Sequence, residues 1–104
     1  MSDIFLVYST FADEGEAVSV AETLLSERLI ACANITATRS IYVWEGSLHN
    51  GPEAAMISKT VKEKVPEVIA RIKTLHSFDV PCIVAYPLAE GYGPFLNWVK
   101  EETR

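Results

Sequence analysis

Hydrophobic positions follow two periods along the chain, and each period predicts one kind of element. Short apolar runs rich in β-branched and aromatic residues predict strands, whereas apolar residues spaced three and four apart predict amphipathic helices. The predicted strands are 4–8, one long strand formed by 29–35 and 39–45 with room for a bend at 36–38, then 54–60 and 82–86. The predicted helices are 13–29, 61–75 with Pro66 in its first turn, and 95–102.

The long second strand and the strand at 54–60 form a predicted hairpin, because the segment 46–52 between them is rich in turn-forming residues. Extended at ~3.3 Å per residue, the stretch 31–45 would measure about 50 Å, whereas a compact chain of this length has a radius of gyration near ~13 Å. Part of the hairpin is therefore expected to project. Its apolar side chains favour self-association, and the alternative is a hairpin that curls back over its own sheet. The apolar side chains of the projecting part are Ile41 and Val43 on one face and Tyr42 and Trp44 on the other.

The order of the elements is β-α-β-β-α-β followed by a terminal helix, which predicts an α+β, ferredoxin-like sandwich with an extended hairpin and a C-terminal helix. No linker or low-complexity segment interrupts the chain, so residues 1–104 are expected to form a single domain. The fold implies the strand order 4-1-3-2. Cys32 and Cys82 would then lie on strands at opposite edges, too far apart for a disulfide.

Composition narrows the classes of protein. The 104 residues carry 9 basic and 14 acidic side chains, a net charge of −5, and 49% of them are hydrophobic. The acidic balance argues against nucleic acid and anionic membrane surfaces as partners. We expect a cytoplasmic location, because neither a signal-like start nor a spanning segment is found. Nucleotide-binding loops and common hydrolase motifs are missing, so we expect no enzymatic activity and no cofactor needed for folding.

Five separated stretches, in this order, resemble the CutA family of divalent cation tolerance proteins over nearly the whole chain. They are ERLIACANI at 27–35, RSIYVWEG at 39–46, SKT at 58–60, HSFDVP at 76–81 and LNW at 96–98. The resemblance implies a ferredoxin-like homotrimer whose long strands cross the subunit boundaries, and a link to tolerance of copper and other divalent metals. This sequence departs from the family pattern of metal-associated residues at Ser9, Leu75 and Cys82, and retains His76.

His76 and Cys82 are the candidate metal ligands. In an antiparallel pairing of the first and fourth strands, Ser9 and Thr10 approach Cys82, and His76 lies on the connecting turn. An imidazole and a thiolate favour copper(I) or zinc, with Asp79, a second subunit or water completing the coordination. The alternatives are a histidine that binds carbonyl groups at a helix C-terminus and a cysteine packed at the start of a strand. His49 is expected to be a solvated residue at the hairpin tip.

The family's trimeric architecture implies clefts between subunits, lined by Arg39, Tyr42, Trp44 and Lys59. The two cations would suit a bound anion, or they would pair with Glu45 or another carboxylate. Packing in the core or in an interface is the alternative role for the aromatic residues.

Three functions remain open from the sequence. The first is a cytoplasmic, non-enzymatic, trimeric divalent cation tolerance protein that binds copper or another divalent metal. The second is a trimeric signalling protein that binds a small anionic ligand in the clefts and acts on an unknown protein partner. The third is an interaction scaffold with only an indirect connection to metals.

Overall fold

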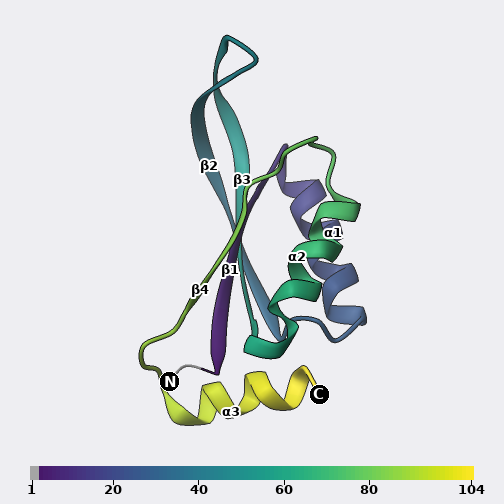
Figure 1. Ribbon diagram of the computed structural model, residues 1–104, viewed down its shortest axis with the longest axis vertical. Helices are drawn as coiled ribbons and strands as arrows, with labels where there is room; N and C mark the ends of the chain where they lie inside the picture. Colours follow the sequence, from purple (N-terminus) through teal and green to yellow (C-terminus); the bar gives the residue numbers. More distant parts are fainter. Residues whose placement is uncertain (1–2) are drawn as a thin grey trace.

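The computed structural model describes residues 3–104, and its elements follow the predicted order (Figure 1). The strands are β1 (Ile4–Phe11), β2 (Cys32–Trp44), β3 (Ser47–Val61) and β4 (Ile83–Pro87). The helices are α1 (Glu14–Ser26), the short 3-10 helix η1 (Lys62–Lys64), α2 (Val65–Leu75) and α3 (Gly93–Glu102). No helix in the described part is long and apolar enough to cross a membrane.

All paired strands run antiparallel in the order β2-β3-β1-β4, so the predicted topology is confirmed. α1 and α2 lie side by side on one face of the sheet, and α3 crosses its lower end (Figure 1). Cys32 and Cys82 are free thiols at opposite edges, as expected. The α+β fold is therefore a sheet layer and a helix layer with a terminal helix across one end.

The sequence of β1 shows why the core forms where it does. Val7, Ser9 and Phe11 alternate along the strand and face the helices, where they are fully buried. The main core brings these β1 side chains together with apolar residues of α1, α2 and β3, including Leu24, Ile72 and Met56. A second cluster, built around Ile4, Ala31 and Val99, anchors α3. The two clusters hold α1, α2 and α3 against the sheet.

The hairpin differs from the prediction in one important respect: its turn is not the segment 46–52. Trp44 pairs with Ser47, so only Glu45 and Gly46 form the turn. Both have positive φ, 50° and 80°, as a type I′ hairpin turn requires. The predicted turn residues from Ser47 onward belong to β3 instead, so His49 is exposed, as expected, but lies in a strand and not in a loop. β3 is consequently 15 residues long.

The upper part of this hairpin projects beyond the rest of the sheet, as predicted (Figure 1). β1 ends at Phe11, which pairs with Ala54, so residues 38–44 and 47–53 pair only with each other. The molecule extends 44 Å along its longest axis but only 26 and 21 Å along the other two. The projecting arm accounts for this elongation.

Smaller differences from the prediction lie at the ends of elements. The first helix ends at Ser26 rather than Leu29, and the second strand starts at Cys32. A 3-10 turn precedes α2, whose first turn holds Pro66 as expected.

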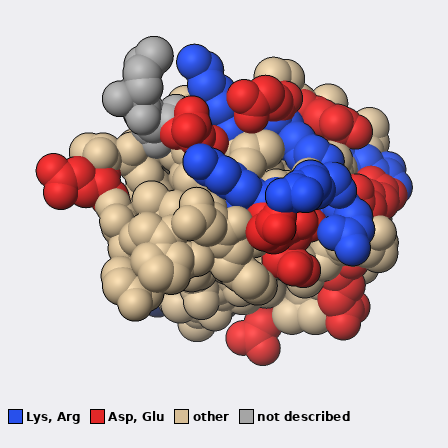
Figure 2. Space-filling model, turned by 90° about the horizontal axis from the view of Figure 1, so that it is seen from below, with Lys and Arg blue, Asp and Glu red and all other residues tan. Residues whose placement is uncertain are grey.

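Viewed from the α3 end, basic and acidic side chains are interspersed beside a broad area without charge (Figure 2).

Candidate functional site

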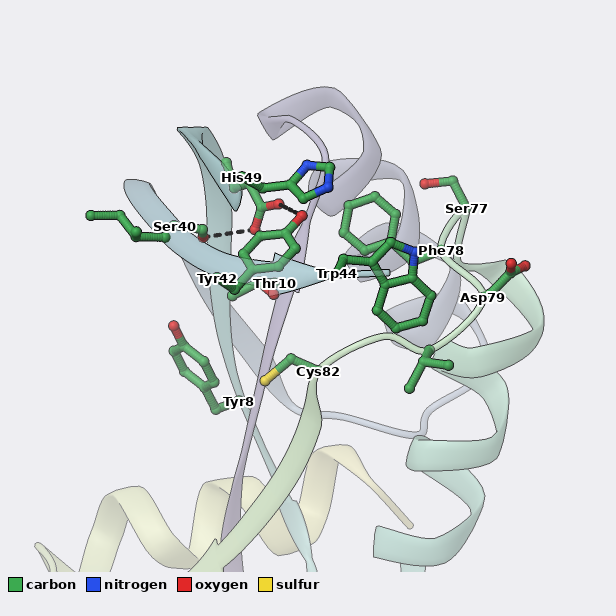
Figure 3. Close-up of a pocket in the computed structure, with 13 residues that line it drawn as sticks. Tyr8, Thr10, Ser40, Tyr42, Trp44, His49, Ser77, Phe78, Asp79 and Cys82 are labelled. Atoms are coloured by element: carbon green, nitrogen blue, oxygen red, sulfur yellow. Dashed lines mark hydrogen bonds between the residues drawn. The ribbon is translucent and has the colours of Figure 1, made fainter. Parts of the chain in front are cut away.

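A hollow lies between the projecting hairpin and the loop that joins α2 to β4 (Figure 3). It has a volume of about 770 Å³. The hairpin supplies one wall through Ser40, Tyr42, Trp44, His49 and Glu53, and the loop supplies the other through residues 77–80 and Cys82. Tyr8 and Thr10 of β1 form the floor. A cavity of this size suits a small molecule.

The hairpin wall is set by the twofold repeat of β structure. Ser40, Tyr42 and Trp44 alternate along β2, and His49 lies directly opposite Tyr42 on β3. The rings of Tyr42 and His49 stack with their centroids 5.1 Å apart. Because the tip turn contains only two residues, this register places all of these side chains on the face that looks toward the loop.

Glu53 is the fixed charge of this wall. Its Oε1 accepts a hydrogen bond from Ser40 Oγ at 2.7 Å, and its Oε2 accepts one from the Tyr42 hydroxyl at 3.3 Å (Figure 3). Desolvation and the adjacent Glu53 carboxylate raise the pKa of Tyr42, so its hydroxyl keeps its proton and remains a donor. The wall therefore presents a carboxylate held by two neutral hydroxyls.

His76, at the end of α2, uses both ring nitrogens within the fold. The Phe78 N–H donates to Nδ1 at 3.0 Å, and Nε2 lies 2.7 Å from the Thr10 carbonyl oxygen. Since Nδ1 accepts, the proton is assigned to Nε2, which then donates to Thr10. The ring also stacks on Phe11 at 4.7 Å. This geometry resembles the carbonyl-binding alternative, although the carbonyl belongs to β1 and not to the helix.

Cys82 is exposed, lines the pocket and precedes β4. Its carbonyl accepts the Thr10 N–H at 3.4 Å, so Thr10 is bonded to both candidate ligand residues. Ser9 pairs with Ile83, but its side chain is buried on the helix face and not in the pocket. Within residues 3–104, no three His, Cys, Asp or Glu residues group closely enough to hold a metal. His76 is not among the residues that line the pocket, and Thr10 contacts the Cys82 carbonyl and not its thiol, so no contact found among the described residues joins the two candidate donor atoms.

The four predicted cleft residues separate into two pairs. Tyr42 and Trp44 line the pocket, whereas Arg39 and Lys59 do not appear among its lining residues. Arg39 Nε donates to Asn50 Oδ1 at 2.8 Å, and Lys59 donates to Asn34 Oδ1. Both cations are thus engaged with neutral amides on the hairpin, and these contacts give no support to an anion in this pocket.

Sequence reasoning missed Glu53 and Ser40. A signal was present, because an uninterrupted strand from 47 to 61 places His49 and Glu53 on one face by alternation. The Gly-, Asn- and Pro-containing composition of 46–52 concealed it, since it favoured a loop there.

Comparison with known proteins agrees with the fold. The model of the family described as CutA1 divalent ion tolerance protein matches residues 5–102. The divalent-cation tolerance protein CutA of Pyrococcus horikoshii is 42% identical, covering 97% of this chain and 99% of the relative. The solved structure of a CutA1 from Ehrlichia chaffeensis superposes with a TM-score of 0.94 at 35% identity, covering 100% and 98% of the two chains. The solved structure of a protein described as the periplasmic divalent cation tolerance protein CutA from Archaeoglobus fulgidus superposes with a TM-score of 0.94 at 39% identity. The match covers 97% of this chain and 99% of that chain. This chain belongs to the CutA1 divalent ion tolerance protein family.

Proposed function

We propose that this chain is a non-enzymatic, cytoplasmic homotrimer that contributes to divalent cation tolerance by binding copper, or zinc, through His76 and Cys82. Membership of the CutA1 family supports the role in tolerance. The observation that supports the site is a pair of contacts made by Thr10. Its carbonyl oxygen accepts a hydrogen bond from His76 Nε2, and its N–H donates to the carbonyl oxygen of Cys82. One residue of β1 thereby contacts both candidate residues, His76 through its ring and Cys82 through its backbone.

The chemistry of the pair suits a soft or borderline ion. A thiolate and an imidazole are ligands of copper(I) and zinc. Binding through His76 Nε2 would exchange the contact with the Thr10 carbonyl for a bond to the metal and move the ring proton to Nδ1, which would then no longer accept the Phe78 N–H. Cys82 would bind as a thiolate and release its proton, so affinity falls as the pH falls. A second copy of the chain, Asp79 or water supplies the remaining coordination.

The proposal of a homotrimer rests on the exposed hairpin. Ile41, Val43 and Leu48 are more than 60% exposed in the isolated chain, which is unusual for a cluster of large aliphatic side chains. Their burial against other copies would remove this surface from water and stabilise the arm. The cytoplasm is proposed because its reducing conditions keep Cys82 and Cys32 as free thiols. The core is built from apolar side chains, so folding requires no metal.

Titration of copper(I) and of zinc under reducing conditions tests the site. We expect His76→Ala and Cys82→Ser each to weaken binding by far more than the roughly tenfold effect of losing an outer-sphere contact. Cys32→Ser is the matched control, since Cys32 is the other cysteine and lies at the opposite edge of the sheet. Light scattering on the same samples is expected to give three times the chain mass of 11.5 kDa.

Unchanged affinity in the His76→Ala/Cys82→Ser double variant would refute the metal site. Equal losses in Cys32→Ser and Cys82→Ser would show that the thiols bind without selectivity, which would also refute it. A mass of a single chain at micromolar concentration would refute the trimer while leaving the metal result to be judged separately.

A further inference from the structure

Glu53 carries a negative charge that the described part of the chain leaves without a cationic partner. The carboxylate is half-buried and accepts bonds from the hydroxyls of Ser40 and Tyr42. The ion pairs found within residues 3–104 lie elsewhere, and they join Arg71 to Glu27, Lys100 to Asp3 and Arg104 to Glu101. Two hydroxyl donors orient the carboxylate but do not neutralise it, so the charge remains available to a cation.

Aromatic rings line the same hollow as this charge. Tyr42 contacts Glu53 through its hydroxyl, and Trp44 lies two residues beyond Tyr42 toward the tip of the hairpin. Phe78 lines the hollow from the loop, and Tyr8 lies on its floor (Figure 3). Asp79 adds a second carboxylate on the loop. No Lys or Arg is found among the described residues that line the pocket. The π faces of aromatic rings attract cations, so the rings and the carboxylates of this pocket both favour a positively charged ligand.

We propose that this pocket binds a small organic cation with a methylated ammonium head. Its positive charge lies against Glu53, and its methyl groups pack on the rings of Tyr42 and Trp44. Cation–π attraction and apolar contact act together on a head group of this type. The proposed ligand differs in class from the metal of the proposed function, and its binding does not depend on His76.

The chemistry of the wall favours a methylated head over a primary ammonium. A primary ammonium is strongly hydrated and needs acceptors for three N–H groups. Two of the roughly four acceptor sites of Glu53 are taken by hydroxyls, so Glu53 alone replaces that hydration only in part. A methylated ammonium has no donor to satisfy and requires only negative potential and apolar surface, which this wall supplies. An anion, in contrast, would meet Glu53 and Asp79, and His49 is the one basic residue among the described lining residues, with no Lys or Arg beside it.

The test compares choline with 3,3-dimethyl-1-butanol, its uncharged counterpart with carbon in place of nitrogen. Both are titrated into metal-free, chelator-treated full-length protein while the indole N–H resonance of Trp44 is followed by NMR. Trp98→Phe assigns this resonance, because the chain has two tryptophans. We expect saturable shifts with choline and at least tenfold weaker binding of the alcohol.

Glu53→Gln keeps the shape and the acceptor oxygen of the side chain and removes its charge. It is expected to weaken choline binding at least tenfold and to leave the weak affinity for the alcohol unchanged. Glu22→Gln is the matched control, since it makes the same change of net charge at an exposed position on α1. We expect wild-type affinity in that variant.

Equal affinity for choline and for the alcohol would overturn the proposal. So would undiminished choline binding in Glu53→Gln, or a loss in Glu22→Gln as large as that in Glu53→Gln. The absence of any shift at tens of millimolar choline would also overturn it, and in an assembled protein that result would mean that a second copy of the chain fills the pocket. None of these outcomes depends on whether His76 and Cys82 bind a metal.

Discussion

Ser9 is a fully buried residue whose hydroxyl oxygen has no hydrogen-bond partner within the described residues. A buried hydroxyl without a partner loses its hydration and gains nothing in return. We therefore expect Ser9→Ala to raise the free energy of unfolding by about 1 kcal/mol. Urea denaturation at a fixed protein concentration measures this change, and a decrease in stability would contradict it.

Thr60→Val is the matched comparison for Ser9→Ala. Thr60 is equally buried on the same face of the sheet, but its Oγ1 donates to the Leu29 carbonyl at 2.6 Å. The valine keeps the volume and removes the donor, so we expect a loss of about 1–3 kcal/mol. Opposite signs for the two substitutions would separate the energetics of the hydrogen bond from those of side-chain volume.

Glu16 ties the start of α1 to the loop after α2. Its Oε2 accepts from the Ser77 N–H at 2.8 Å and its Oε1 from the Ala12 N–H at 3.1 Å. Partial burial acts to raise the pKa of Glu16, but the hydrogen bonds from Ser77 and Ala12, together with the nearby His76, outweigh it and lower the pKa below the ordinary 4.5. The folded protein therefore binds a proton here less readily than the unfolded chain does.

A lowered carboxyl pKa contributes stability that is complete above pH 4.5 and is lost as the pH falls through the folded-state value. We expect Glu16→Gln to be less stable than wild type at pH 7 and the difference to shrink steadily below pH 4.5. Thermal unfolding over a pH series measures it, with the exposed Glu22→Gln as the control. A difference that did not vary with pH would show that Glu16 acts through its shape and not through its charge.

At the scale of elements, the length of the arm depends on its two-residue turn. Gly46 has a φ of 80°, a conformation that residues with a Cβ adopt at a penalty of about 1–2 kcal/mol. We expect Gly46→Ala to destabilise the protein by about 1 kcal/mol, because a Cβ there meets no neighbour and only the backbone conformation opposes it. Gly51→Ala is the control within the same hairpin, since its Cβ is equally unobstructed and its φ is not positive. Equal effects in thermal unfolding would rule out the conformational explanation.

The same hairpin shows how far the sequence predicts the fold. Periodicity and β propensity located every strand and helix, because the core requires apolar side chains on one face of each. They failed at 47–52, where Gly51 and Pro52 suggest a loop. β1 ends opposite Ala54, so this part of β3 has a free edge, where a proline is tolerated. Whether a strand pairs with β3 on both sides of Pro52 depends on the tertiary structure, and the local composition does not predict it.

The same limit applies to the pocket. Tyr42 and Trp44 are predicted from the family resemblance to line clefts between subunits, which stays a prediction, and within the single chain they line this hollow. Glu53 was missed because its place follows from the register across the tight turn. Arg39 and Lys59 are predicted from the same resemblance to line the clefts between subunits, and within the single chain their hydrogen bonds run to Asn50 and Asn34. Side-chain partners of this kind depend on cross-strand pairing, and a one-residue change in register would reverse the faces.

At the scale of the whole molecule, the shape of the chain points to assembly. The radius of gyration is 14.2 Å, above the ~13 Å of a compact chain of this length. The excess comes from an arm whose two strands have only each other as partners, and an isolated two-stranded hairpin is marginally stable in water. The half of the arm nearer the tip nevertheless exposes large apolar side chains, Ile41, Val43, Trp44 and Leu48, as expected if its stability comes from contacts with other copies.

Val43 and Leu48 face each other across the arm and are 67% and 69% exposed in the single chain. If copies of the chain bury this pair, Val43→Lys/Leu48→Lys places two ammonium groups in an apolar interface, at several kcal/mol per unpaired charge. We expect the double variant to sediment as a single chain of about 11.5 kDa at micromolar concentration, with its far-UV circular dichroism retained because neither residue belongs to the core. Val18→Lys, on α1 and 40% exposed, is the control and should keep the wild-type mass. An oligomer of unchanged mass in the double variant would mean that this face of the arm stays in water and that the copies meet elsewhere.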